Sequence, residues 1–141
     1  MKTLKLTIFV MAALLSFGSC KKDEPEAKAK SPAELIIGKW ALVSYARTQT
    51  FTDKSKPAKV ENQTGLSTDY FEFTSDGKLK TNVNNEALDE TYTLSSDGKT
   101  LTIKGDPSVT IKTLNATSLI YTGTSSEPEW TSEYTATLKR L

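Results

Sequence analysis

The sequence predicts an all-β fold, an eight-stranded antiparallel up-and-down barrel preceded by a short N-terminal helix. Short stretches in which large apolar residues alternate with polar ones recur along residues 39–141, and this period is typical of half-buried strands. Asp76-Gly77 and Asp97-Gly98 lie between such stretches and favour tight hairpin turns. The chain also contains 21 Thr, 5 Tyr, 5 Phe and 2 Trp, residue types that pack well on a pleated sheet.

The helix is predicted just before the first strand. Ser31 can serve as its N-cap, Pro32 fits the first helical position, and Glu34 completes a capping box. Gly38 follows three apolar residues and ends the segment. The helix can therefore have only one or two turns.

Eight strands follow, separated by short turn sequences. We expect them around residues 39–47, 68–74, 79–83, 86–94, 101–103, 109–111, 119–122 and 130–141. Short connections favour antiparallel pairing of sequential neighbours, and no segment is long enough to be the helical crossover of a parallel sheet. Closure into a barrel would remove the two exposed edges of a flat sheet.

Fourteen side chains are predicted to point inward. They are Phe71, Phe73, Leu79, Val83, Tyr92, Leu94, Leu101, Ile103, Val109, Ile111, Leu119, Tyr121, Tyr134 and Leu138. An eight-stranded barrel is just wide enough to be filled by side chains or to hold one small ligand. So many large residues favour a packed interior over an open pocket, and both alternatives remain open at this point.

One long connection, residues 48–65, has no clear periodicity and a single large aromatic residue, Phe51. Long loops in compact domains are often functional or disordered. We interpret this segment either as a lid over the barrel mouth or as a mobile polar loop.

The composition argues against several classes of function. The chain has no His and a single Cys, Cys20, so it can form neither a His-dependent catalytic triad nor an intrachain disulfide. The 18 Lys and Arg balance 17 Asp and Glu, which argues against a nucleic-acid binder. Asp89 and Glu90 are adjacent and would point to opposite faces of a strand. We therefore predict no catalytic residue, no metal, no cofactor and no enzymatic activity.

The N-terminus has the pattern of an export signal. Lys2 and Lys5 precede an uncharged, mostly apolar run over residues 6–17. As a helix this run would rise roughly 18 Å, less than the ~30 Å hydrocarbon core of a bilayer. A signal peptide over residues 1–19 therefore fits better than a membrane span.

Gly18-Ser19-Cys20 resembles the lipobox of bacterial lipoproteins, although Phe17 stands where Leu is more usual. The resemblance implies that Cys20 is lipidated and becomes the first mature residue. Residues 20–30 then read as a charged, disordered tether. Within it, Lys22, Asp23 and Glu24 resemble the export signal of Bacteroidota surface lipoproteins, which implies an outer-membrane protein exposed on the cell surface.

The domain over residues 31–141 resembles the lipocalins. Gly38-Lys39-Trp40 looks like the Gly-x-Trp motif that opens the first lipocalin strand, and Arg140 resembles the Arg that packs across that Trp. The stretches IIGKWALVSY, YTLSSDGKTLTI and TATLKRL are similar to small lipocalin-like lipoproteins of Bacteroidota. The resemblance implies that Trp40 and Arg140 close one end of the barrel.

The function expected from these features is non-catalytic binding of a small apolar or amphipathic ligand inside the barrel of a monomeric, membrane-anchored protein. The aromatic residues predicted to line the pocket are Phe71, Phe73, Tyr92, Tyr121, Trp130 and Tyr134. The alternative is a protein- or envelope-interaction module with a filled barrel and no small-molecule ligand.

Overall fold

The computed structural model describes residues 29–141, which form one helix and nine strands. The elements are α1 (Pro32–Ile36), β1 (Gly38–Phe51), β2 (Lys59–Thr64), β3 (Tyr70–Phe73), β4 (Lys78–Val83), β5 (Glu86–Leu94), β6 (Thr100–Ile103), β7 (Val109–Leu114), β8 (Ser118–Glu127) and β9 (Trp130–Arg140). The predicted signal peptide, Cys20 and the residues Lys22, Asp23 and Glu24 lie outside the described residues.

The predicted capping box starts α1. The Ser31 Oγ accepts a hydrogen bond from the backbone N–H of Glu34 at 3.3 Å, and the Glu34 carboxylate accepts one from the backbone N–H of Ser31 at 2.8 Å. Gly38 follows with φ +126°, a backbone conformation that glycine adopts without a steric penalty. This position turns the chain from the helix into β1.

Eight of the strands form the predicted closed antiparallel barrel. Sequential neighbours pair from β3 to β9, while β1 pairs with β3 through Gly38–Ala41 and with β9 along nearly its whole length. The pairing of β1 with β9 closes the ring, so the fold class is confirmed. The two Asp-Gly turns also form, with Gly77 at φ +78° and Gly98 at φ +70°.

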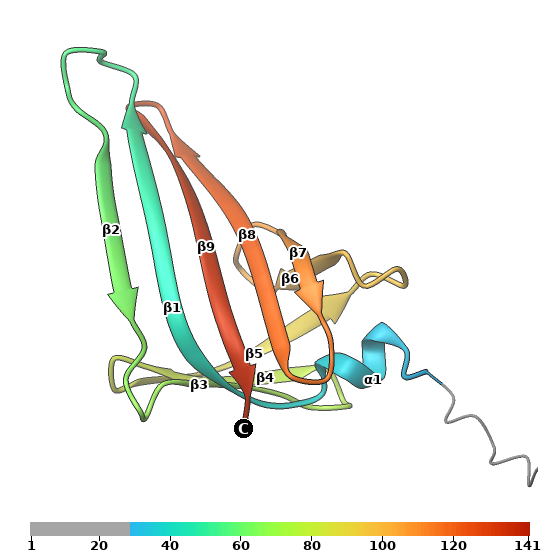
Figure 1. The fold of residues 1–141 in the computed structure, drawn as a ribbon. Coiled ribbons are helices and arrows are strands. Elements are labelled where there is room, and N and C mark those ends of the chain that lie inside the picture. The colour runs from blue at the N-terminus through green and yellow to red at the C-terminus, as the bar shows by residue number, and fades with distance from the viewer. Residues whose placement is uncertain (1–28) are drawn as a thin grey trace, which may run out of the picture.

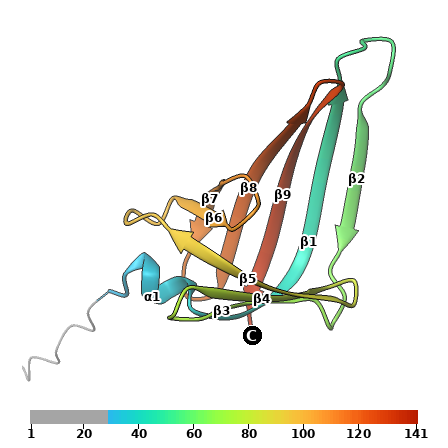
Figure 2. The same cartoon turned by 180° about the vertical axis from the view of Figure 1, so that it is seen from behind.

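The strands differ in length, and the barrel is consequently asymmetric (Figure 1). β2, β1, β9 and β8 stand side by side as a tall sheet, and β3 and β4 cross beneath its base. α1 lies beside the same base, while β6 and β7 form a short wall at one side, as the view from behind also shows (Figure 2). The upper part of the tall sheet therefore extends beyond the barrel.

The core contains all fourteen side chains that were predicted to point inward. Eight of them are buried and six are partly buried against the same cluster. Ile36 from α1, Trp40 and Leu42 from β1 and Ala136 from β9 complete the buried apolar set. Period-two alternation was sufficient to identify the inner face because each β-strand places successive side chains on opposite sides.

The prediction for residues 48–65 was wrong in both of its forms. β1 continues to Phe51, and Lys59–Thr64 forms a ninth strand that pairs with β1 from Ser44↔Thr64 to Gln49↔Lys59. This hairpin extends the tall sheet and is neither a lid nor an irregular loop. The alternation was hidden because both faces of this region carry polar residues, with side chains such as Thr48, Gln49 and Asn62 in place of apolar ones.

β8 is also longer than predicted. It runs to Glu127 and pairs with β9 as far as Trp130, whereas the sequence predicted a strand only over 119–122. The additional residues are mostly Ser and Thr and carry no apolar signal. Their pairing depends on the neighbouring β9, which provides the partner for their backbone groups.

Candidate functional site

The end of the barrel next to α1 is closed by Trp40 and Arg140, which face each other in the β1–β9 ladder. Trp40 is fully buried, and its indole Nε1 donates to the carbonyl of Ile36 at 2.8 Å. The Arg140 guanidinium carbon lies 4.1 Å from the centroid of the Trp40 ring. Such a cation–π contact contributes about 0.5–2 kcal/mol.

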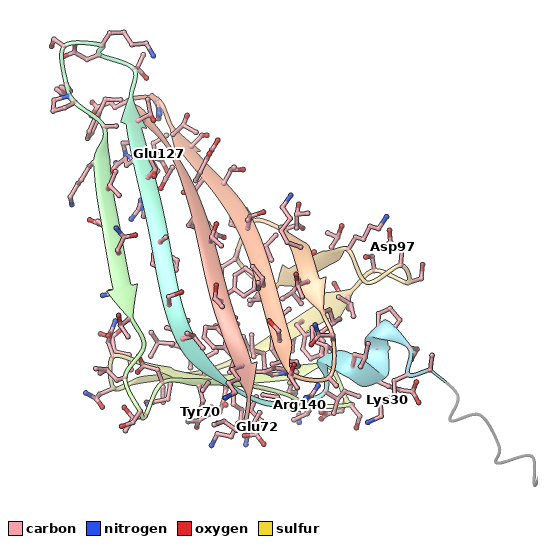
Figure 3. The ribbon with its side chains drawn as sticks, in the orientation of Figure 1. Lys30, Tyr70, Glu72, Asp97, Glu127 and Arg140 are labelled. Carbon is pink, nitrogen blue, oxygen red and sulfur yellow. The ribbon has the colours of Figure 1, made fainter. Side chains whose placement is uncertain are left out.

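Arg140 also connects three segments through its guanidinium. It donates to the carbonyls of Leu35 and of Ile37, the latter at 2.8 Å, and to the carbonyl of Ala116 at 2.7 Å. The first two carbonyls lie at the C-terminal end of α1, where the helix leaves acceptors without intrahelical partners. Figure 3 shows Arg140 at the base of β9 next to α1, far from Glu127 at the other end of the tall sheet.

A glycine is required beside this cluster. A Cβ at Gly38 would lie 2.6 Å from a terminal nitrogen of Arg140, and the positive φ of Gly38 disfavours any other residue. The Gly-x-Trp pattern at the start of β1 thus has a direct physical basis. Glycine leaves room for the arginine, and the tryptophan provides the surface on which the arginine packs.

A cavity of about 320 Å³ lies among side chains of β4, β5, β6, β7 and β8. Its floor consists of buried side chains from four strands, Leu79, Leu101, Val109 and Tyr121. Its rim is formed by residues at the β4–β5 and β6–β7 turns, including Asn84 and Asp106. A volume of this size lies at the lower end of the ~300–1,000 Å³ typical of small-molecule sites.

The cavity opens where the barrel wall is incomplete. β5 pairs with β4 over Glu86–Thr91, but with β6 only from Tyr92 onward. The β6-facing edge of Glu86–Glu90 thus has no strand partner among the described residues, and Leu88 on this stretch is 58% exposed although it lines the cavity. This gap gives solvent access to an apolar interior.

Tyr121 brings a polar group into the cavity. The residue is 8% exposed, and burial is the largest cause that raises its pKa above the ordinary value of 10. Within residues 29–141 its hydroxyl forms no hydrogen bond, whereas the Tyr92 hydroxyl donates to the Thr74 carbonyl at 2.9 Å. A hydroxyl at this position can therefore donate to a ligand.

Tyr134 forms the wall beside Tyr121. Its ring lies 5.8 Å from that of Tyr45, and it covers Gly123 on the neighbouring strand, where a Cβ would overlap with the ring. Burial is also the main cause that raises the pKa of Tyr134. The phenol is therefore neutral at physiological pH and able to donate a hydrogen bond.

The structure brings together three of the six residues predicted for the pocket, because Phe71, Tyr121 and Tyr134 line the cavity. Phe73 and Tyr92 pack edge to face, with ring centroids 5.0 Å apart, in the core beside the β3–β4 turn. Neither of these two residues lines the cavity.

Trp130 lies elsewhere, at the far end of the tall sheet. Its ring contacts Arg47, whose guanidinium carbon is 5.4 Å from the ring centroid. Arg47 also donates to the buried hydroxyl of Ser132 at 2.6 Å. Trp130 shares the inner face predicted for it, but the length of β9 carries it beyond the cavity.

Sequence reasoning missed the polar rim of the cavity. Glu86, Leu88 and Glu90 alternate along β5 and all line the cavity, a period-two signal that the two adjacent acids Asp89 and Glu90 concealed. Asp106 lies in a turn and has no sequence pattern that would place it at a site. Only the closure of the barrel brings it to the same opening as β5.

Comparison with known proteins identifies no family for this chain. No protein-family model and no curated protein matches the chain. Among solved structures, it is similar to a protein of unknown function of the DUF3598 family from Nostoc punctiforme, with 14% sequence identity and a TM-score of 0.41. The match covers 77% of this chain and 49% of that protein, so the chain spans about half of its length.

Within residues 29–141, no helix is long and apolar enough to cross a membrane.

Proposed function

We propose that this protein is a lipid-anchored, lipocalin-like monomer that binds a small apolar or amphipathic molecule without catalysis. The observation that carries the proposal is the cavity of about 320 Å³ inside the barrel. A ligand that enters it would transfer apolar surface from water to contact with Leu79, Leu101 and Val109. Burial of apolar area contributes roughly 25 cal/mol per Å² before the costs of association.

Tyr121 and Tyr134 support the proposal because ligand sites combine apolar walls with a few polar groups that fix orientation. Both tyrosines line the cavity, and their raised pKa values favour the protonated hydroxyl as a donor. A ligand with an acceptor group would satisfy the Tyr121 hydroxyl, which forms no hydrogen bond within the described residues. These contacts bind and orient a molecule and provide no reaction.

The anchor that we propose is Cys20, acylated in a protein of Bacteroidota type and held in the outer membrane. Residues 21–30 would form the tether, and Lys22, Asp23 and Glu24 would direct the domain to the cell surface. Two or more acyl chains give stable membrane binding, whereas one chain is marginal. α1, at the start of the domain, packs against the β5–β6 turn, where Pro32 lies next to Gly98. The cavity opens at two other turns, β4–β5 and β6–β7, so the tether would join the domain away from the opening.

Native mass spectrometry of the full-length protein isolated from its own membrane tests ligand binding. We expect a non-covalent adduct that survives gentle ionisation, in addition to the acyl mass on the protein. Purified protein should also take up an apolar probe such as a fatty alcohol. The absence of both an adduct and any probe uptake would contradict the proposal.

Replacement of Cys20 tests the anchor separately. Cys20→Ala should abolish labelling by a radioactive or alkyne-tagged fatty acid and release the protein from the membrane fraction. Neutral replacements at Lys22, Asp23 and Glu24 should leave labelling intact but protect the domain from protease added outside the cells. Unchanged labelling of Cys20→Ala would overturn the lipobox assignment.

A second candidate function is an interaction module, and the free edge of β2 favours it. Within the described residues β2 pairs only with β1, so its outer edge has no partner, and Val60 on this strand is 62% exposed. An unpaired edge can accept a strand from another chain. Val60→Lys would weaken such a contact without changing the cavity. If this variant lost its cellular function while variants of the cavity lining kept it, the second candidate would be favoured.

A further inference from the structure

The charges around the cavity are strongly one-sided. Its lining contains the three acidic residues Glu86, Glu90 and Asp106 and no Lys or Arg. The whole chain, in contrast, has 18 basic and 17 acidic residues. Asp106 and Glu86 are exposed at the rim, and Glu90 is partly buried. The lining of the cavity thus carries three acidic side chains and no basic one, although the chain as a whole is nearly neutral.

None of these three acids forms an ion pair within the part of the chain that the structure describes. The ion pairs found there join Lys59 to Glu61 and Lys78 to Asp76. Lys78, Lys80 and Lys104 line a neighbouring groove that Glu90 also borders, but none of the three lines the cavity. The three acids are spread around the lining, since no three acidic side chains in residues 29–141 come close enough to hold a metal ion. The arrangement therefore suits an organic cation better than a metal ion.

Arg47 pairs directly with Tyr134 in the β1–β9 ladder. Its positive charge would offset the acidic residues if its side chain pointed into the cavity. Its guanidinium is directed to Ser132 and Trp130, nearer the start of β9, and neither of these residues lines the cavity. Arg47 is not a cause of the raised pKa of Tyr121 or Tyr134, whereas the charge of Asp106 contributes to raising both. Burial is the largest cause that raises the pKa of both tyrosines, and Asp106 adds a smaller contribution of the same sign.

The aromatic walls provide a second type of contact for a cation. Phe71, Tyr121 and Tyr134 all line the cavity, and the faces of aromatic rings attract ammonium groups. Tyr121 adds a hydroxyl that has no hydrogen-bond partner within the described residues, on a residue that is 8% exposed. A cationic head group and an apolar tail would both find complementary surroundings in one space.

We propose that the cavity selects amphiphiles with a cationic, ammonium-type head group over amphiphiles with a carboxylate. This inference rests on the proposed function and specifies its ligand class. The apolar tail contacts Leu79, Leu101 and Val109 on the floor, and the head group remains at the rim between Glu86, Glu90 and Asp106. A carboxylate head group would be repelled by the same three acids.

Three probes with the same decyl chain test the proposal: decyltrimethylammonium, decanoate and decanol. The purified full chain is titrated with each by calorimetry at low ionic strength, below the concentrations at which the probes form micelles. We expect decyltrimethylammonium to bind at least about tenfold more tightly than decanoate. The difference should shrink as salt is added, because rim charges are screened.

The outcomes separate this inference from the proposed function. If decanol and both charged probes bind with equal affinity, or if decanoate binds best, the charge selectivity is overturned while ligand binding stands. If none of the three probes binds, the proposed function itself fails. Tighter binding of the cation, with a salt-dependent advantage, supports both.

A neutralised variant shows whether the rim is the cause. Glu86→Gln, Glu90→Gln and Asp106→Asn together should abolish the preference for the cation and leave decanol binding unchanged. The matched control combines Glu72→Gln, Asp89→Asn and Glu133→Gln, which remove the same charge from residues that do not line the cavity. An unaltered preference in the rim variant, with a melting temperature that shows it is folded, would overturn the proposal.

Discussion

Tyr134 lies across Gly123, its direct partner in the β8–β9 ladder, so that a Cβ on Gly123 would overlap with the tyrosine ring. The pair connects the tall sheet with the cavity, since Tyr134 lines the cavity and also packs against Tyr45. The absence of a side chain at position 123 lets the ring lie flat on the sheet. The shape of the cavity wall therefore depends on a glycine that does not itself line the cavity.

Gly123→Ala should displace Tyr134 and destabilise the protein. Overpacking of this kind typically costs 1–3 kcal/mol, which urea denaturation would measure. Thr124→Ala, on the next and exposed position of β8, is the matched control and should stay within about 0.5 kcal/mol of the wild type. Equal stability of the two variants would show that Tyr134 moves aside without cost.

Trp40→Ala should lower the free energy of unfolding by about 3–5 kcal/mol, the usual range for truncation of a buried aromatic residue. The change would remove the surface on which Arg140 packs and leave the Ile36 carbonyl without its indole donor. Thermal and chemical denaturation would measure the loss. Trp130→Ala is the comparison at a partly exposed tryptophan, and a larger effect there would contradict a closing role for Trp40.

Asp69→Ala should destabilise the connection between β2 and β3. Asp69 is 2% exposed, and its carboxylate accepts hydrogen bonds from the backbone N–H groups of Leu66 at 2.8 Å and Asn84 at 3.0 Å. A buried donor left without a partner costs about 1–3 kcal/mol. Asp89→Ala, at an exposed position, provides the control in the same denaturation experiment. Faster amide exchange at Asn84 in Asp69→Ala would locate the effect at the β4–β5 turn.

Thr81→Phe should fill part of the cavity and weaken ligand binding. Thr81 lines the cavity from β4, while the preceding Lys80 is exposed on the other face of the strand. Lys80→Phe therefore adds the same side chain outside the barrel and should keep the affinity of the wild type. Titration of both variants with decanol would measure the difference, and equal affinities would place the ligand elsewhere.

Alkaline pH should destabilise the protein through the buried Tyr121. Below pH 10, the ordinary pKa of tyrosine, both the folded and the unfolded chain keep Tyr121 protonated, so this residue does not alter stability. Above pH 10 the unfolded chain releases the proton while the folded chain retains it, and stability falls as pH rises. Urea denaturation at pH 8, 10 and 11 should show this fall, and Tyr121→Phe should reduce it. An identical pH dependence in the two proteins would contradict the assignment.

The inner face of the barrel could be predicted from the sequence because alternation is a local property. Leu79, Leu101 and Leu138 each follow the period of their own strand, and all three are buried. The capping box of α1 and the two Asp-Gly turns depend on residues within four positions of one another, and they too were identified correctly. The β1–β2 hairpin was missed because its polar side chains give no contrast between the two faces of the sheet.

The sequence by itself determined the fold class, the inward residues and the glycine and tryptophan that start β1. Only the tertiary structure decided that a cavity remains inside the barrel, because the space left by large side chains depends on how eight strands curve around it. It also decided that Asp106 shares an opening with Glu86 and Glu90. These residues belong to segments that do not pair over this stretch, and no local pattern relates them. Their arrangement around one opening, and the charge selectivity that we propose from it, arises from the closure of the barrel.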